Sequence, residues 1–310
     1  MQKVIKIGTR KSLLALAQSN LIKDQIEAQY PDVTVELVKM VTKGDKILDV
    51  PLAQVGGKGL FVKELEEAML NHEADIAVHS MKDVPAELPE GLHLGIITKR
   101  EDPRDVFISN EYKSFDEVPA GSKIGTSSLR RRSQLANLRP DLIIEDLRGN
   151  LDTRLRKLDE KQFDAIILAA AGLNRLKIDR ATSYFDPADM LPAVGQGAVG
   201  IELRVSDSEL LAALQFLAHK DTFDTVSAER AFLLRLQGGC QVPIAAYSQV
   251  DGDTLTLTGL VSSIAGDRVI REVAVGKRND ANTIGIALAE KILGLGGKEI
   301  LEEVYGECIL

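Results

Sequence analysis

The sequence predicts an α/β protein with two domains of similar plan, followed by a smaller α+β domain with a three-stranded antiparallel sheet. Three observations lead to this fold class. Strand-like and helical runs alternate over the first two thirds of the chain, which is typical of mostly parallel sheets covered by helices on both faces. A strand that ends in Gly-Thr and leads into a helix occurs twice, at Lys6–Leu13 and Lys123–Arg130. After Lys220 this alternation gives way to three strand-like runs joined by hairpin turns.

The first domain begins with a strand at Val4–Ile7 and a helix whose apolar residues recur at helical spacing from Leu13 to Ile22. Further elements are expected at 33–41 (strand), 62–70 (helix), 74–78 (strand) and 92–98 (strand). A strand at Ile201–Arg204 and a helix at Glu209–His219 rejoin this domain later in the chain. Its predicted boundaries are therefore 1–98 together with 197–217.

The second domain is predicted at 103–193. Besides the repeated motif, its elements are expected at 106–109 (strand), 142–147 (strand), 151–161 (helix) and 163–168 (strand). The run Phe163–Leu168 resembles Ala74–Val78, as two domains of one plan would produce, although strand–Gly–helix turns also recur by chance. Lys99–Pro103 is polar and ends in proline, so we expect it to cross between the domains, with the return near Pro192–Gly197.

The third domain is predicted at 220–310. A helix at Thr222–Leu236 leads to a Gly-Gly-Cys loop that ends at Cys240. Strands are expected at 244–250, 254–262 and 268–275, and a helix at 283–293 closes the plan. A cysteine on such a loop can reach a ligand, and its thiolate is a nucleophile. The alternative for Cys240 is a purely structural role.

Composition excludes several classes of function. The 310 residues contain 46 acidic and 38 basic side chains, a net charge of -8, so the surface as a whole does not favour nucleic acid or anionic membranes. The cysteines, Cys240 and Cys308, are far apart, and the four histidines are scattered, so no disulfide framework and no metal site are expected. No apolar run approaches the ~20 residues that cross a bilayer.

The N-terminus imitates a secretory signal, because basic residues precede the apolar run Leu13–Ala17. That run is short, and the strand-like Val4–Ile7 precedes it, so we expect a cytoplasmic protein. The stretch Thr42–Gly59 is rich in charge and glycine, and we expect a mobile lid there rather than a plain surface insertion. Gly195–Gly200 has the letters of a dinucleotide motif, but a strand follows it instead of a helix.

A basic cluster indicates where a ligand binds. The segment 123–156 has eight basic and four acidic residues. Arg130 and Arg131 open a helix after small polar residues, where free N–H groups favour anions and arginine adds bidentate carboxylate binding. Arg148 and Gly149 follow a strand, the position at which open α/β sheets bind ligands. We interpret the cluster as a site for a polyanionic small molecule between two domains; the alternative is a solvated basic face.

Lys82 and Asp83 follow the buried strand Ala74–Val78. An aspartate close to a ligand can stabilise a cationic intermediate or transfer protons. The alternative for Asp83 is a capping or turn residue. The spacing alone does not decide between them.

Five motifs occur in order, and together they closely resemble the porphobilinogen deaminase (hydroxymethylbilane synthase) family: Ile7–Ser12, Val55–Phe61, His79–Pro85, Gly125–Arg131 and Gly239–Cys240. The resemblance covers essentially the whole chain. It implies two periplasmic-binding-protein-like (type II) domains and one α+β domain. It also implies a transferase of haem biosynthesis that joins four porphobilinogen molecules head to tail, releasing ammonia, to give hydroxymethylbilane. A dipyrromethane cofactor, bound to Cys240 by a thioether, primes the chain.

The resemblance also assigns roles to residues. Asp83 is the implied catalytic carboxylate, which stabilises the cationic azafulvene and pyrrole nitrogens. The residues implied to bind the cofactor are Cys240, Lys82, Asp83, Thr126, Ser127, Ser128, Arg130, Arg131, Arg148 and Gly149. Those implied for the substrate are Arg10, Ser12, Arg148, Arg154, Arg175 and Gln196. We expect a monomer with no metal, no nucleic acid and no membrane partner. The runner-up is a non-enzymatic two-domain module that closes on an organic anion.

Overall fold

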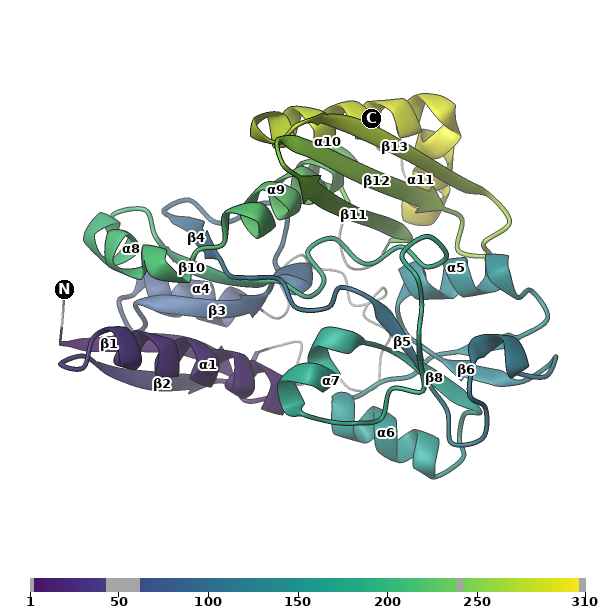
Figure 1. Cartoon of the computed structure of the whole chain (residues 1–310), viewed down its shortest axis with the longest axis horizontal. Coiled ribbons are helices and arrows are strands. Elements are labelled where there is room, and N and C mark those ends of the chain that lie inside the picture. Colours follow the sequence, from purple (N-terminus) through teal and green to yellow (C-terminus); the bar gives the residue numbers. More distant parts are fainter. Residues whose placement is uncertain (1–2, 43–61, 239–241, 307–310) are drawn as a thin grey trace.

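The computed structural model describes residues 3–42, 62–238 and 242–306 and contains three sheets (Figure 1). The first has the order β2-β1-β3-β10-β4, formed by Thr34–Met40, Val4–Arg10, Ile76–Ser80, Val199–Arg204 and Leu92–Ile97. The second has the order β7-β6-β8-β5-β9, formed by Ile143–Glu145, Lys123–Gly125, Ala165–Ala169, Asp105–Ile108 and Ser183–Tyr184. The third has the order β11-β12-β13, formed by Ile244–Asp251, Thr254–Ser262 and Val269–Lys277. We call the units around these sheets domains 1, 2 and 3.

Domains 1 and 2 share one plan, which confirms the internal repeat. In domain 1, β1 lies parallel between β2 and β3, and in domain 2, β6 lies parallel between β7 and β8. The backbone N–H of Lys6 donates to the Asp75 carboxylate at 2.7 Å, and that of Lys123 donates to Asp164 at 2.6 Å. Equivalent aspartates therefore fix equivalent strand pairs.

Both α/β sheets are mixed, whereas the sequence predicts mostly parallel ones. β10 runs antiparallel to β3 and β4, and β5 runs antiparallel to β8 and β9. Val199 pairs with Ser80, the last residue of β3, and Asp105 pairs with Ala169, the last residue of β8. β10 and β5 therefore each start where the neighbouring strand ends. A chain that arrives from the other domain enters at this edge of the sheet and must therefore run in the opposite direction.

Helices cover both faces of the sheet in domain 1, as predicted. α1 (Leu13–Gln29) and α8 (Ser208–Leu214) contribute to an apolar cluster with the strand residues Ile7 and Ile76. α4 (Lys63–Leu70) packs with Ala77 on the other face. Short 3₁₀ turns at Met81–Asp83 and Gln215–Leu217 complete this domain.

Domain 2 is likewise covered on both faces. α6 (Leu151–Asp159) and α7 (Ala170–Leu176) pack on one face, and α5 (Leu129–Leu138) packs on the other, beside a 3₁₀ turn at Phe115–Glu117. The sequence analysis misses α7 because its Ala-Ala-Gly start follows β8 with no polar break. Local apolar content at such a junction does not separate a strand from a helix.

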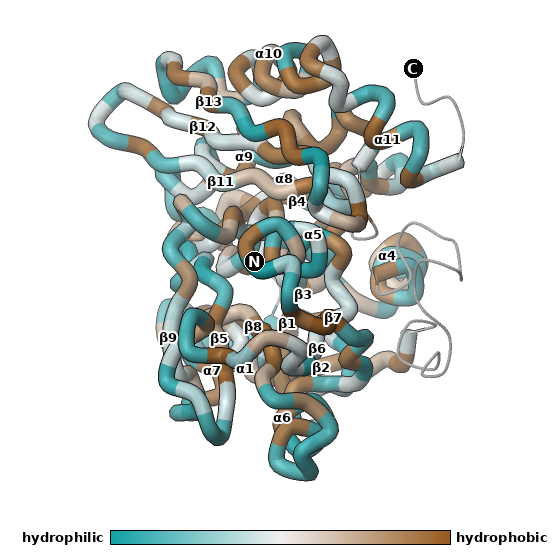
Figure 2. Tube along the Cα trace, turned by 90° about the vertical axis from the view of Figure 1, so that its right-hand side faces the viewer, coloured by the Kyte–Doolittle hydropathy of each residue, from teal (hydrophilic) through white to brown (hydrophobic). Residues whose placement is uncertain are grey.

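Domain 3 confirms the predicted antiparallel sheet, with α9 (Lys220–Arg235) and α10 (Ala281–Ile292) packed against it. The alternation of brown and teal along α10 in Figure 2 follows its one buried face, which includes Ile284 and Leu288. The prediction that this helix closes the plan is wrong, because α11 (Lys298–Tyr305) follows. Gly296, at φ 103°, bends the chain between them without ending it.

A buried cluster of titratable groups lies between α4 and the sheet of domain 1. His79 of β3 contacts the carboxylate of Glu202 on β10 at 2.9 Å, and both side chains are buried. Glu66 of α4 lies close to them. Burial and then the charge of Glu202 raise the pKa of Glu66 to about 7, opposed by His79 and Lys63 and reinforced by Glu67.

We expect Glu66→Gln to remove part of the pH dependence of stability. Since the pKa of Glu66 is higher in the folded chain, the folded state binds more protons between pH 4.5 and about 7. The free energy of unfolding of the wild type therefore falls over that interval, by roughly 1–3 kcal/mol. The glutamine variant should match the wild type near pH 5 and exceed it near pH 8 in urea unfolding. Glu73→Gln, at an exposed position whose charge is not among those acting on Glu66, is the control. Identical pH slopes in all three proteins would contradict the prediction.

Candidate functional site

The predicted site residues gather where strands of domains 1 and 2 end. β1 ends at Arg10, and β3 leads into the turn Met81–Asp83. In domain 2, β6 ends at Gly125, directly before Thr126. Because β1 and β3 are parallel, as are β6, β7 and β8, these ends share one edge in each sheet. Val199 pairs with Ser80 and Asp105 pairs with Ala169, so the segments that cross between the domains enter β10 and β5 at those edges.

The segments 99–103 and 192–197, to which the sequence assigns the domain crossing, lie side by side. The backbone N–H of Glu101 donates to the carbonyl of Gly197 at 3.0 Å, and Arg100 Nε donates to the carbonyl of Gln196 at 2.8 Å. The guanidinium of Arg100 also pairs with Glu229 of α9 at 2.6 Å. All three domains therefore meet at this crossing.

A buried aspartate that the sequence analysis misses organises the arginine cluster. Asp105, at the start of β5, accepts from Arg130 Nη1 at 2.7 Å and from Arg131 Nη2 at 2.8 Å, and all three side chains are buried. Burial alone would raise the pKa of Asp105, but the two guanidinium charges hold it well below its usual range. Arg131 Nε also donates to Asp105, at 3.1 Å. Nη1 of Arg130 donates to the carbonyl of Leu191, and Nη1 of Arg131 donates to that of Ile167.

One atom of this network stays unpaired among the described residues. Arg130 Nε is buried and makes no hydrogen bond there. A buried donor without a partner costs free energy unless something accepts from it. The network therefore keeps one donor that is not used by the described residues.

Gln196 connects Asp105 to the turn that follows β3 in domain 1. Its side-chain nitrogen donates to Asp105 Oδ1 at 2.9 Å, and its oxygen lies 3.5 Å from Lys82 Nζ. Burial and then the charge of Arg131 lower the pKa of Lys82 to about 8, while Asp83 opposes the shift. A lysine with this pKa can gain or lose a proton near neutral pH.

The charge of Arg154, in domain 2, interacts with Asp83 and with the neighbouring cations Arg131 and Arg148. Burial and then the charges of Arg131 and Arg148 lower the pKa of Arg154 to about 10, and the Asp83 carboxylate opposes this shift. Arg154 Nε donates to the carbonyl of Gly149 at 2.8 Å. Gly149 has φ +114°, and a side chain there would collide with Thr153, so the turn itself requires glycine.

The predicted hydroxyl residues shape the start of two helices. Ser12 Oγ accepts from the N–H of Ala15 in α1, and Ser128 Oγ accepts from the N–H of Arg131 in α5. Thr126 Oγ1 accepts from the N–H of Ser128, and Ser127 Oγ donates to the carbonyl of Leu147. These side chains fix helix starts that carry partial positive charge at the site.

Arg175 is held at the domain crossing, and three predicted features are outside the described residues. Arg175 donates to the carbonyl of Gly197 at 2.6 Å, and burial lowers its pKa against the charge of Glu101. It therefore lies beside the segments that connect domains 1 and 2. The features outside the described ranges are Cys240, all of Thr42–Gly59 except Thr42, and the whole motif Val55–Phe61.

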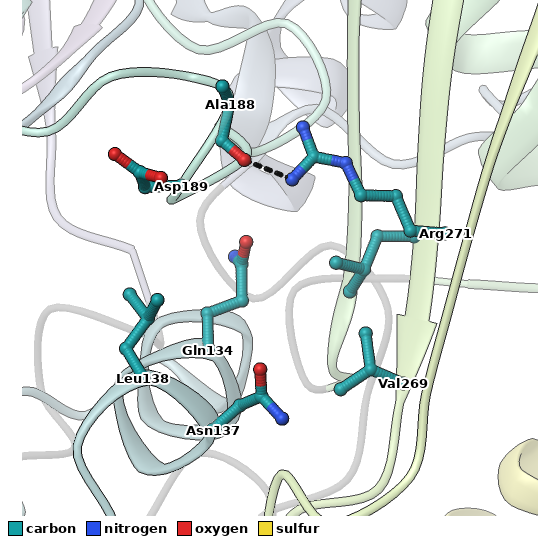
Figure 3. Close-up of a pocket in the computed structure, with 8 residues that line it drawn as sticks. Gln134, Asn137, Leu138, Ala188, Asp189, Val269 and Arg271 are labelled. Carbon is teal, nitrogen blue, oxygen red and sulfur yellow. Dashed lines mark hydrogen bonds between the residues drawn. The ribbon is translucent and has the colours of Figure 1, made fainter.

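A pocket of about 210 Å³ lies between α5 and the sheet of domain 3 (Figure 3). Gln134 and Asn137 line it from α5, and Arg271 lines it from β13, donating to the carbonyl of Ala188. Gln134 and Asn137 already donate to backbone carbonyls. The pocket is therefore part of the packing between domains 2 and 3.

Neither a metal centre nor a membrane span is found within the described ranges. No group of three His, Cys, Asp or Glu residues there has an arrangement that could hold a metal ion. No helix in 3–42, 62–238 or 242–306 is long and apolar enough to cross a bilayer.

We expect Asp105→Asn to be strongly destabilising. Asparagine keeps the shape but leaves two buried guanidinium groups without a counter-charge, and breaking a buried ion pair typically costs about 3–5 kcal/mol. Urea unfolding measures the loss. Asp102→Asn is the control, since Asp102 pairs with the more exposed Arg104, where pairs contribute about 0–1 kcal/mol. Equal unfolding midpoints for the two variants would contradict the role of Asp105.

Comparison with known proteins gives consistent matches. The family model described as porphobilinogen deaminase, dipyromethane cofactor binding domain, matches residues 5–212, and the model of the porphobilinogen deaminase C-terminal domain matches residues 223–294. A porphobilinogen deaminase of Geobacter sulfurreducens is 59% identical over 302 residues, covering 97% of this chain and 95% of the relative. One from Trichlorobacter lovleyi is 58% identical over 304 residues, covering 98% and 97%.

Solved structures show a more distant likeness. A putative methionine-binding lipoprotein from Bacillus subtilis is 14% identical, with a TM-score of 0.43, over 70% of this chain and 90% of the other. The periplasmic aliphatic sulphonate binding protein SsuA from Escherichia coli is 14% identical, with a TM-score of 0.42, over 76% and 71%. These scores are too low to carry an argument about the site.

Proposed function

The chain belongs to the porphobilinogen deaminase family, and from this premise we propose that Asp83 is its catalytic carboxylate and Cys240 its point of cofactor attachment. The enzyme polymerises porphobilinogen to hydroxymethylbilane in tetrapyrrole biosynthesis, and its cofactor is dipyrromethane. The bound cofactor supplies the pyrrole end to which substrate units are added. Every other role falls to side chains of the protein.

The donor set of the site fits this cofactor and substrate. Each pyrrole carries an acetate and a propionate, so a bound chain is a polyanion. The site offers Arg148 and Arg154, whose charges act on each other, and Lys82, on which the charge of Arg131 acts. It also offers the buried Arg130 Nε, which has no hydrogen-bond partner among the described residues. Guanidinium groups bind carboxylates well, because charge-assisted hydrogen bonds are strong. We assign Arg10, Ser12, Arg131, Arg175 and Gln196 to the same binding surface.

We propose that the small polar residues of the α5 start contribute to cofactor binding. Thr126, Ser127 and Ser128 lie between β6 and α5, and Gly149 lies between β7 and α6. The three hydroxyls already orient the backbone. They would present N–H groups of the helix start to a cofactor carboxylate.

Asp83 carries the chemistry in this proposal. Loss of ammonia from porphobilinogen leaves a cation on the substrate, and the following coupling places positive charge on a pyrrole. A carboxylate fixed beside these atoms stabilises that charge and can hold a proton. The observation that carries the assignment is the interaction of Asp83, in domain 1, with Arg154 of domain 2, in addition to that with the neighbouring Lys82.

We also propose the domain boundaries 1–98 with 197–217, 103–193, and 220–310. The hydrogen-bonded crossings at Arg100–Glu101 and Gln196–Gly197 support the first two. A cytoplasmic monomer that binds no nucleic acid completes the proposal. The signal-like N-terminal stretch forms β1 and α1, within the apolar core of domain 1.

The purified wild type tests the assignment directly. Incubation with porphobilinogen should release four ammonia molecules for each hydroxymethylbilane formed. Intact mass should exceed the sequence mass by a dipyrromethane, and size exclusion should give one chain of 33.7 kDa plus that cofactor. A protein with the bare sequence mass that still turns over would overturn the covalent attachment.

A further inference from the structure

The turn that carries Asp83 rests on α9 of domain 3. Met81 and Val84, the residues on either side of Lys82 and Asp83, are buried in one apolar cluster with Val226 of α9. The N–H of Met81 donates to the carbonyl of Ala198 at 3.0 Å. The apolar side chains of the turn are therefore held by packing, and part of that packing comes from α9 of domain 3.

Arg230, one turn further along α9, holds the chain directly after Asp83. Its guanidinium donates to the carbonyls of Val84 at 3.3 Å, Pro85 at 2.8 Å and Ala86 at 3.1 Å. Three backbone acceptors on one planar fork leave this segment little freedom. Burial lowers the pKa of Arg230, and the charge of Glu202 in domain 1 opposes this, so the cation also has a counter-charge in domain 1.

α9 is also the element that leads to the proposed cofactor cysteine. The helix ends at Arg235, and the chain reaches Gly238 just before Cys240. Glu229, next to Arg230, accepts from the N–H of Gly195 at 2.7 Å and pairs with Arg100. α9 therefore makes hydrogen bonds to the segment after Asp83 and to the domain crossing. It also precedes Cys240 in the chain by a few residues.

We propose that Arg230 is a positioning residue for Asp83, which sets the carboxylate at a fixed place relative to the cofactor end of α9. This inference rests on the proposed role of Asp83. Arg230 donates to peptide carbonyls and so acts through the turn, not on the reacting atoms. Displacement of a catalytic group by about 1 Å typically lowers a rate by about 100-fold.

The experiment is a double-mutant cycle on the holoenzyme, with cofactor loading checked by intact mass. Arg230→Met keeps the aliphatic stem and removes the donors. We expect kcat to fall by about 10- to 100-fold, with KM changed much less. In the Asp83→Asn background the same substitution should have little further effect on kcat, because the group that it positions has lost its charge.

Two further variants keep the test decisive. Arg230→Lys retains one donor group and should give a kcat between those of the wild type and Arg230→Met, and it serves if the methionine variant folds poorly in urea unfolding. Arg235→Met, on the same helix and paired with the exposed Glu290, should keep the kcat of the wild type.

The outcomes separate this inference from the proposed function. Wild-type kcat in a folded Arg230→Met protein, or equal losses in the wild-type and Asp83→Asn backgrounds, would overturn the role of Arg230. Normal turnover of Asp83→Asn alone would instead overturn the proposed function. A loss confined to cofactor loading would overturn the positioning role and leave Arg230 as a support for folding of the site.

Discussion

Replacing Cys240 by serine is expected to remove the covalent cofactor and reduce turnover to background. A thiolate is a far better nucleophile than a hydroxyl at neutral pH, so serine cannot form the corresponding bond at a useful rate. Intact mass should fall by the cofactor increment in addition to the change from sulfur to oxygen. The chain should remain folded, because α9 ends at Arg235 and β11 begins at Ile244, so the substitution falls in the sequence between them.

Cys308→Ser provides the matched control for this prediction, since it removes the only other cysteine of the chain. It should keep both the mass increment and the activity. Peptide mapping of the wild type should locate the increment on the peptide that contains Cys240. An adduct on Cys308, or full activity of Cys240→Ser, would refute the assignment.

Asp83→Asn is expected to lower kcat by about 10²–10³-fold, the usual cost of removing a group that stabilises transition-state charge. Asparagine keeps the size and hydrogen-bonding reach of the side chain but loses the negative charge. Because Lys82 and Arg154 then lose the counter-charge that this residue supplies, the cation formed from the substrate meets net repulsion. Steady-state formation of hydroxymethylbilane measures the effect.

Asp83→Glu is the companion variant, because it keeps the charge in a displaced position. It should retain more activity than the asparagine variant. Circular dichroism and urea unfolding should show both variants to be folded, since Asp83 lies in a short turn outside the apolar clusters. Near-wild-type turnover of folded Asp83→Asn would leave Asp83 as a turn residue.

Much of the fold could be predicted because its signals are local. The Gly-Thr motifs at the ends of β1 and β6 and the hairpins of domain 3 have patterns that depend on neighbouring residues only. The direction of β10 and β5 could not be predicted in this way. It depends on the edge at which a chain returning from another domain enters the sheet. α11 escaped prediction because the glycines after Leu293 indicate an end, whereas the chain there only bends.

The candidate site was partly predictable for a similar reason. Lys82 and Asp83 follow one predicted strand, and Arg130 opens the helix that follows another. The ends of parallel strands converge. Asp105 and Glu202 carry a weaker signal, since each is an acidic residue beside or within an apolar run. Such a position predicts a buried charge that needs a partner. It does not identify the partner.

By itself, the sequence determined the three-sheet plan, the family and the cysteine and aspartate on which the proposed chemistry depends. Only the tertiary structure decided which charges pair: Asp105 with Arg130 and Arg131, Glu229 with Arg100, and Arg230 with the carbonyls after Asp83. The reason is physical. Secondary structure follows from interactions between near neighbours, but a buried charge is satisfied by whatever group the packing of distant segments brings within about 3 Å, and that packing is a property of the folded chain as a whole.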